Sequence, residues 1–225
     1  MSCCQPPPKD DVVLSALPPE SIREAAALAA AAFDQSPPYL WLCRGKSNAF
    51  RQRFLRWIFE RNFRLRVGAR TNRAVFDGDG KLVAFCMFVT PEVPDVSLAD
   101  MIRAGLLGAP FLFGPAVVKR LLAMKAEYEQ VEHGIMEAHG NVPMCRLERM
   151  VVRPDAQGRG IGRRALQQAL VEADEANLPV LLSTQEERNV RFYRRLGFEV
   201  VRTDEHQEAY TSWAMLRQPR GSASF

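Results

Sequence analysis

Residues 150–162 read Met150-Val151-Val152-Arg153-Pro154-Asp155-Ala156-Gln157-Gly158-Arg159-Gly160-Ile161-Gly162, and this stretch decides the fold of the chain. An apolar strand ends at a proline, and a glycine-rich turn then opens directly into a helix. Glycine has no Cβ, so the backbone of such a turn lets a ligand approach closely. The first amides of a helix lack intrahelical partners and lie at the positive end of its dipole. The stretch therefore predicts a phosphate or pyrophosphate site, to which Arg159 and Arg163 add positive charge.

The helix after the turn is predicted from about Gly160 to Ala176. One of its faces is apolar and is formed by Ile161, Ala165, Leu166, Ala169, Leu170 and Ala173. The turn is not a Rossmann fingerprint, because Arg163 stands where the last glycine is required. It also lacks the Gly-Lys-Ser/Thr ending of a nucleotide-hydrolase loop. A turn whose glycines only shape the chain is the remaining alternative.

Outward from this stretch, hydrophobic periodicity predicts further strands and helices on both sides. The predicted strands cover residues 12–16, 73–76, 82–90, 145–152, 180–184, 198–202 and 210–216. The predicted helices cover residues 18–33, 47–65, 97–138 as two helices divided near Gly114-Pro115, 160–176 and 189–196. The strand–helix–strand unit implies a right-handed parallel crossover, and the hairpins imply a mixed sheet. We expect a mixed α/β fold with six to seven strands, flanking helices and a helical insertion before the central strand.

Composition and cysteine count limit the class of protein. Hydrophobic residues make up 47% and charged residues 25% of the chain, which is typical of a globular protein with a sizeable core. Five cysteines without a CxxC pair, and three histidines without ligand spacing, indicate neither a disulfide framework nor a metal site. The longest apolar stretch, 104–118, is too short to cross a bilayer. We expect a cytoplasmic protein that does not bind a membrane.

A single domain is predicted over residues 11–218. Residues 1–10 are polar and proline-rich and are predicted to be a disordered N-terminus, and residues 219–225 a flexible tail. Within the domain, residues 44–73 contain one acid, Glu60, among many basic residues. The interleaved aromatic residues fall at helical core spacing, which favours a packed helix over a nucleic-acid surface. We therefore expect no nucleic-acid partner, and a site for acidic groups on this segment is the alternative.

Two motifs together carry a family resemblance. They are Gln157-Gly158-Arg159-Gly160-Ile161-Gly162 and Asn189-Val190-Arg191-Phe192-Tyr193-Arg194-Arg195-Leu196-Gly197-Phe198. The pair closely resembles the GNAT superfamily of acetyl-CoA-dependent N-acetyltransferases. Ala32-Phe33, the helical insertion and Thr211-Ser212-Trp213 loosely resemble the branch that contains puromycin N-acetyltransferase. The resemblance implies a GNAT fold, acetyl-CoA as cosubstrate without a metal, and direct acetyl transfer to a small-molecule or peptide amine.

The resemblance also implies where the coenzyme binds. Its pyrophosphate would be held by the amides of Gln157, Gly158, Arg159, Gly160, Ile161 and Gly162, with Arg163 beside them. The pantetheine arm would lie beside Met150, Val151 and Val152, where the two central parallel strands splay apart. The amide near Val151 or Val152 would polarise the thioester carbonyl. Asn189 would be a coenzyme contact, and its residue type also predicts a helix N-cap.

Two side chains are candidates for proton transfer. The resemblance implies that Tyr193 protonates the departing thiolate, and the alternative is a packing aromatic residue. Glu148 precedes Met150 by two residues, so strand alternation predicts both side chains on one face. Glu148 is then a base that takes the amine proton through water, or the partner of Arg146 or Arg149 in an ion pair.

The acceptor and the oligomeric state stay open at this stage. The insertion at 97–138 either forms a wall of the acceptor pocket or packs on the sheet or on another subunit, so a monomer and a homodimer are both compatible. Two other functions compete with acetyl transfer. One is a non-catalytic acyl-CoA-binding regulatory module, and the other is a protein–protein module in which the glycines only shape a turn.

Overall fold

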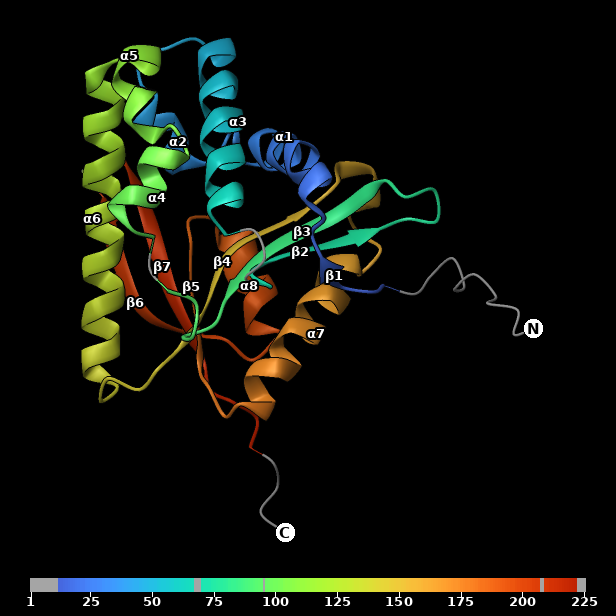
Figure 1. Cartoon of the computed structure of the whole chain (residues 1–225). Helices are drawn as coiled ribbons and strands as arrows, with labels where there is room; N and C mark the ends of the chain where they lie inside the picture. Colours follow the sequence, from blue (N-terminus) through green and yellow to red (C-terminus); the bar gives the residue numbers. More distant parts are fainter. Residues whose placement is uncertain (1–11, 67–69, 95, 207–208, 222–225) are drawn as a thin grey trace.

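A seven-stranded sheet runs through the part of the chain that the structure describes, which is residues 12–66, 70–94, 96–206 and 209–221 of a computed structural model. The strand order is β1-β2-β3-β4-β5-β7-β6 (Figure 1). The strands are β1 (Ser15–Ala16), β2 (Asn72–Phe76), β3 (Leu82–Val89), β4 (Cys145–Val152), β5 (Val180–Thr184), β6 (Glu199–His206) and β7 (Tyr210–Arg217). Only β4 and β5 pair in parallel, and the other neighbours are antiparallel. The predicted mixed sheet of six to seven strands is confirmed.

Helices cover both faces of this sheet. They are α1 (Ile22–Phe33), α2 (Pro37–Leu42), α3 (Asn48–Leu65), α4 (Leu98–Arg103), α5 (Ala109–Phe113), α6 (Pro115–Ala138), α7 (Ile161–Glu175) and α8 (Glu187–Arg194). Three short 3₁₀ turns are η1 (Pro19–Ser21), η2 (Leu106–Gly108) and η3 (Pro154–Ala156). The helical insertion predicted before the central strand is confirmed, since α4, α5 and α6 all precede β4.

One face of the sheet carries α1, α3 and α6. Phe59 and Phe63 of α3 share a core with Phe85 of β3, and α1 packs into the same core through its alanines. Farther along the sheet, Val131 and Ile135 of α6 pack on Leu181, Ala214 and Leu216 of β5 and β7. Figure 1 shows α6 running alongside β6 and β7. Val117 and Met124 of α6 also belong to the core of α1 and α3, so these helices together cover this face of the sheet.

The opposite face carries α7 and α8. Leu166 and Leu170 of α7 and Val190 of α8 share a core with Phe88 and Leu182 of the sheet. The apolar residues predicted for the helix after the glycine-rich turn are all buried in α7. Because β4 and β5 have helices on both faces, the central strands are packed from two sides.

Proline and glycine explain where the predicted helices differ from the observed ones. Pro37 and Pro38 open α2, a helix that the sequence did not predict, because the first turn of a helix needs no amide donors. Gly114 has φ +83 and ends α5 just before α6, which confirms the predicted division. The first predicted helix of that pair is wrong, because α4, η2 and α5 are short pieces separated by Gly105 in a left-handed conformation.

The basic segment forms α3, and its aromatic residues lie in the core as predicted. Phe54 is fully buried, and the guanidinium of Arg61 lies 4.0 Å from the centre of the Trp57 ring. Arg149 of β4 lies over the Phe59 ring at 5.2 Å. The arginines of this segment thus stack on the aromatic residues that anchor it.

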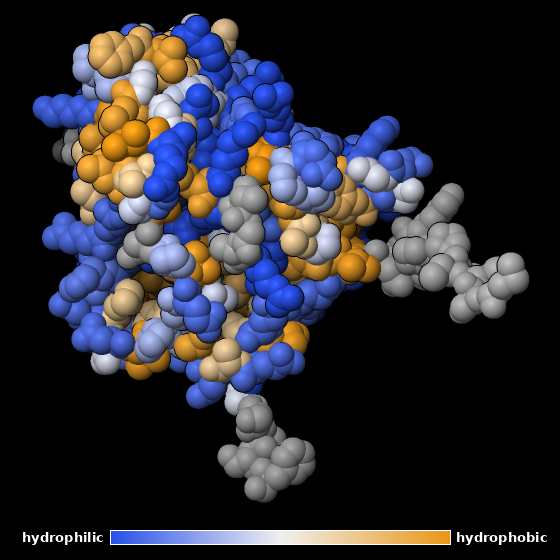
Figure 2. Space-filling model, viewed as in Figure 1, coloured by the Kyte–Doolittle hydropathy of each residue, from blue (hydrophilic) through white to orange (hydrophobic). Residues whose placement is uncertain are grey.

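The outer surface has an apolar region over the insertion. Figure 2 shows hydrophobic side chains gathered near α4 and α5, and the most exposed are Leu98, Ile102, Leu107, Phe111, Leu112 and Leu122. Within the described residues, no helix combines the length and apolar character needed to span a membrane. The predicted disorder of residues 1–10, and residues 222–225 of the predicted tail, lie outside the described residues.

Candidate active site

Strands β4 and β5 diverge at the centre of the sheet. They pair at three positions, Cys145 with Val180, Arg146 with Leu181 and Leu147 with Leu182. Beyond Leu147, β4 continues to Val152 while it stays paired with β3 on its other side. The edge of β4 that faces β5 is therefore open over residues 148–152. An extended ligand with amide groups can pair with such an edge as an added strand does.

The glycine-rich turn lies at the end of this open edge. Gly158 and Gly160 have φ values of +76 and +73, and a Cβ at either position would meet no atom within 4 Å. These two glycines are thus required by backbone conformation and not by a close neighbour. The side-chain amide of Gln157 donates to the Val152 carbonyl oxygen at 3.0 Å and ties the turn to the strand. No side chain caps the first amides of the 15-residue helix α7, which begins directly after the turn.

Gly162 has a different role, because it lets α7 lie directly against β4. A Cβ at Gly162 would lie 3.0 Å from Cγ2 of Val152 and 3.4 Å from Cε of Met150. Met150 and Val152 therefore face α7, while Val151 is buried in the core on the other side, next to α1 and α3. Of the predicted coenzyme-binding residues, Met150, Val152 and Gly162 thus meet between β4 and α7.

Arg153 fixes the turn to the β2–β3 hairpin. Its Nε donates to Asp155 at 2.7 Å, and its Nη2 donates to Asp77 at 3.3 Å. Hydrogen bonds from the backbone of Lys81, from Arg153 and from Asp79 hold the pKa of Asp77 below its ordinary value, although burial acts in the opposite direction. The sequence analysis did not single out this link, because Arg153 and Asp77 are far apart in the chain and no local spacing reveals it.

Tyr193 lies in α8 among other rings. Its ring centre is 5.2 Å from that of Phe192 and 5.7 Å from that of Phe198. Burial raises the pKa of Tyr193, and the neighbouring Cys86 thiol raises it further. The Tyr193 hydroxyl is therefore protonated at neutral pH, as a proton donor must be.

Asn189 is not the N-cap of α8, so that prediction is wrong. The helix begins at Glu187 with Glu186 in the N-cap position, and Asn189 is its third residue. The backbone amide of Asn189 donates to the Glu186 carbonyl oxygen at 2.9 Å. The half-buried side chain of Asn189 is thus not used to cap the helix.

Glu148 occupies an irregular position in β4. The register with β3 shifts there, because Met87 lies opposite Arg149 while Phe88 lies opposite Leu147. Glu148 is the extra residue, so the predicted alternation that put it on the face of Met150 is wrong. Its carboxylate lies 3.2 Å from Nη1 of Arg149 and 3.5 Å from Nη2 of Arg66, which follows α3.

The predicted ion pair of Glu148 with Arg149 is confirmed. Arg146, the other predicted partner, lies instead 3.8 Å from Glu132 of α6. Arg66 was not predicted to take part, because it is distant in the sequence and is brought to Glu148 only by the packing of α3 on the sheet.

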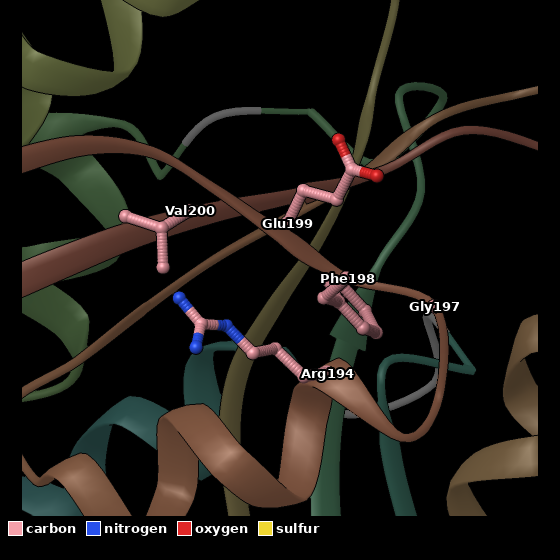
Figure 3. Close-up of a pocket in the computed structure, with 5 residues that line it drawn as sticks. All are labelled: Arg194, Gly197, Phe198, Glu199 and Val200. Atoms are coloured by element: carbon pink, nitrogen blue, oxygen red, sulfur yellow. The ribbon is translucent and has the colours of Figure 1, made fainter.

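One hollow lies away from the glycine-rich turn. It has a volume of about 420 Å³ and is lined by Arg194, Gly197, Phe198, Glu199 and Val200. Figure 3 shows Arg194 reaching from the last turn of α8 toward Val200 of β6. The predicted coenzyme surface follows the open edge of β4 and the start of α7, and we call it the β4–α7 groove.

Comparison with known proteins agrees with this architecture. Residues 120–200 match the family described as acetyltransferase (GNAT) domain. A histone acetyltransferase HPA2 and related acetyltransferase from Corynebacterium glutamicum is similar in fold, with a TM-score of 0.65 and 16% identity over 95% of this chain and 99% of that chain.

Two further structures have the same fold. The polyamine N-acetyltransferase of Drosophila melanogaster has a TM-score of 0.56 and 13% identity over 92% of this chain and 100% of that chain. The paia N-acetyltransferase of Thermoplasma acidophilum, solved in complex with coenzyme A, has a TM-score of 0.51 and 12% identity over 92% and 99%. At these identities the likeness shows the fold, and the predicted fold is confirmed.

Proposed function

We propose that this chain is a GNAT acetyltransferase and that it transfers an acetyl group from acetyl-CoA directly to an amine, which the match of segment 120–200 and the fold support. One observation carries the proposal. The open edge of β4 beyond Leu147 leads directly to the uncapped first turn of α7. A ligand that combines an extended amide-bearing arm with a diphosphate fits this combination.

The residues along the β4–α7 groove match the coenzyme in chemistry. In our proposal the amides of residues 158–162 bind the diphosphate, with Arg159 and Arg163 adding charge, whereas the Gln157 amide donates to the Pro154 carbonyl oxygen at 3.3 Å. Residues 150–152 line the pantetheine arm, and Asn189 contacts the coenzyme from α8. The match of the segment 120–200 to the GNAT domain supports these assignments, since that segment contains all of these residues. The single GNAT domain is proposed to extend over 11–218.

Acetyl-CoA supplies an acetyl group that is activated as a thioester. The amine nitrogen forms a bond to the acetyl carbon, and the bond from that carbon to sulfur breaks. The amide of Val152 donates to the acetyl oxygen as negative charge develops there, because the register turns the Val151 amide toward Phe85 of β3. Tyr193 donates its proton to the departing sulfur, and its raised pKa keeps that proton available at neutral pH. The amine proton goes to a base, for which Glu148 is one candidate.

The acceptor is an amine of a small molecule or a peptide. The Drosophila enzyme of similar fold is named for polyamine acetylation, which supports an amine acceptor here. We propose that α4, α5 and α6 form one wall of the acceptor site, on the face opposite α7. The resemblance to the puromycin N-acetyltransferase branch, the monomeric or homodimeric state and the cytoplasmic location stay predictions.

Thiol release from acetyl-CoA in the presence of pools of amines tests the function. We expect release that depends on the amine, together with an acetylated product identified by its mass. Tight binding of acetyl-CoA without release for any pool would favour a regulatory module instead. Absence of coenzyme binding in calorimetry would favour an interaction module in which the glycines only shape the turn.

A further inference from the structure

A glutamate, a histidine and a serine meet on the face of the sheet that α6 covers. His206 ends β6, and its Nδ1 lies 3.0 Å from Oε2 of Glu127 on α6. Its Nε2 lies 2.6 Å from Oγ of Ser212 on β7. His206 and Ser212 are 5% and 3% exposed, whereas the side chain of Glu127 is 35% exposed. Glu127 is the most exposed of the three residues, and His206 and Ser212 are nearly buried.

The chemistry of the three groups determines the direction of the hydrogen bonds. A carboxylate only accepts, so Nδ1 of His206 carries the proton that is donated to Glu127. The neutral ring then accepts at Nε2 from the Ser212 hydroxyl. When a proton arrives at Nε2, the resulting imidazolium is stabilised by the Glu127 carboxylate. Hydroxyl, imidazole and carboxylate stand in the order that orients a histidine base in enzymes.

The other groups around His206 are two tyrosines and one ion pair. The ring of Tyr210 stacks on His206 at 4.7 Å, and the ring of Tyr128 lies at 5.4 Å. Burial raises the pKa of Tyr128 and of Tyr210, so both are neutral near pH 7. On the same strand as His206, Asp204 is held by Arg202 at 2.8 Å. Glu127 is thus the charged group in direct contact with the ring.

This cluster lies at the divergent end of the central strands. Thr184 of β5 pairs with Trp213, so Gln185, the next residue, lies beside Ser212. Gln185 donates to the Tyr128 hydroxyl at 2.9 Å and thereby joins the end of β5 to α6. Since β5 leaves β4 after Leu182, Ser212 stands one strand away from the opening, on the face opposite α7.

We propose that His206 accepts, through Ser212, the proton that the acceptor amine loses during acetyl transfer, with Glu127 as a positioning residue. The proposal rests on the proposed function. As the amine nitrogen bonds to the acetyl carbon, its proton moves to the Ser212 oxygen, directly or through one water. The Ser212 proton moves to Nε2 of His206. The proton on Nδ1 stays on the ring, where it is donated to Glu127. Glu148, in contrast, is held by Arg66 and Arg149.

The pH dependence of kcat tests this proposal, measured at saturating acetyl-CoA and saturating amine. Imidazole is the side chain that ordinarily changes charge between pH 5 and 8, so the unmodified chain is expected to lose activity on the acidic side of that range. We call this fall of kcat at acidic pH the acidic limb of the profile. The variant H206Q should lose the acidic limb, and its kcat should fall at least about 100-fold. S212A should also lower kcat and weaken the acidic limb of the pH profile. This variant leaves the contact of His206 with Glu127 intact.

Two variants serve as matched comparisons. His133 lies on α6 and faces Glu137 at 3.5 Å, and both side chains are largely exposed. H133Q therefore removes a histidine–glutamate pair of the same type at the surface. This variant should have the kcat and the acidic limb of the wild-type protein. E148Q tests the other candidate base, and we expect its acidic limb to be unaltered. Nitrogen NMR of the imidazole rings adds a readout without turnover, in which His206 should be protonated at Nδ1.

Several results would overturn the proposal. They are an acidic limb retained in H206Q, a limb lost in E148Q instead, an His206 ring protonated at Nε2, or an acetyl group found on Ser212, which would make that serine a nucleophile. If H206Q does not fold, S212A and the tautomer of His206 decide. Wild-type protein that releases no thiol with any amine overturns the proposed function and this inference with it. Wild-type turnover that is unchanged in H206Q overturns this inference alone.

Discussion

Tyr193 has the environment of a proton donor. Burial raises its pKa, so its hydroxyl keeps a proton at pH 7 and can transfer it to a thiolate that develops nearby. In Y193F the ring contacts with Phe192 and Phe198 persist, whereas the proton is gone. We expect kcat to fall about 100-fold while the dissociation constant of coenzyme A stays the same. Steady-state kinetics and calorimetry measure the two quantities.

Unchanged turnover in Y193F would remove this tyrosine from the mechanism. A loss of coenzyme affinity as large as the loss of kcat would instead show that the ring and hydroxyl serve binding.

Single residues show which local structures could be predicted from the sequence and which could not. The positive φ values of Gly158 and Gly160 follow from residue type, and the sequence predicted their turn. The position of Glu148 depends on a bulge against β3, which strand periodicity does not contain. Asn189 has the residue type of an N-cap, yet α8 begins earlier at Glu187. The residue type of Asn189 was therefore not sufficient to predict where α8 begins.

At the scale of elements, the approach of α7 to β4 depends on Gly162. In G162A the new methyl group would lie 3.0 Å from Cγ2 of Val152, which forces the start of α7 away from the strand. We expect a loss of about 1–2 kcal/mol of stability and weaker coenzyme binding, because the first amides of α7 move with the helix. Thermal unfolding and calorimetry measure both effects.

G134A is the matched control for this variant. Gly134 lies inside α6, and a Cβ there would meet Arg202 at an ordinary distance of 3.6 Å. This alanine should stabilise the protein by about 1 kcal/mol and leave coenzyme binding unchanged. An equal loss of stability in both variants would contradict the contact between α7 and β4 as the cause.

An ion pair joins the end of α7 to β7. Both Asp174 oxygens lie 2.7 Å from guanidinium nitrogens of Arg217, which is nearly buried. Burial alone would raise the pKa of Asp174, but the bonds from Arg217 and from the Arg220 amide hold it below its ordinary value. D174N leaves Arg217 without its charge partner, so we expect a loss of about 2 kcal/mol at pH 7, measured by thermal unfolding.

The sign of the pH effect follows from the lowered pKa. The contribution of Asp174 to stability is complete above its ordinary pKa and is lost as the pH falls below it. The difference in melting temperature between wild type and D174N should therefore shrink from about pH 5 to about pH 3. E129Q, which removes the charge from an exposed i,i+4 pair with Lys125, should cost less than about 0.5 kcal/mol. A constant difference across this pH range would contradict the ion pair as its source.

Across the whole molecule, the sequence predicted the strand–helix–strand unit and the mixed sheet because both depend on local periodicity. The order β5-β7-β6 and the position of α6 over those strands depend on long-range pairing, which a single sequence does not reveal. The cluster of Glu127, His206 and Ser212 was missed for that reason. Each residue lies on a different element, and their spacing in the sequence carries no signal.

Coenzyme A should stabilise the whole fold, because its two halves would contact two different elements, α7 and β4. The diphosphate would bind the start of α7, and the pantetheine arm would bind the open edge of β4. At a concentration of about 100 times the dissociation constant, binding to the folded state alone adds about 2.7 kcal/mol. For a chain of this size that corresponds to a rise in melting temperature of about 5–10 °C.

Pantetheine is the informative comparison ligand, because it can pair with β4 but has no diphosphate for α7. At equal concentration it should raise the melting temperature much less than coenzyme A. Equal shifts for the two ligands would mean that the strand edge alone holds the ligand and that the glycine-rich turn makes no anion contact. No shift with coenzyme A, at concentrations where related folds bind it, would contradict the β4–α7 groove as a coenzyme site. The glycines would then serve only the backbone conformation of the turn, since Gly158 and Gly160 have positive φ with or without a ligand.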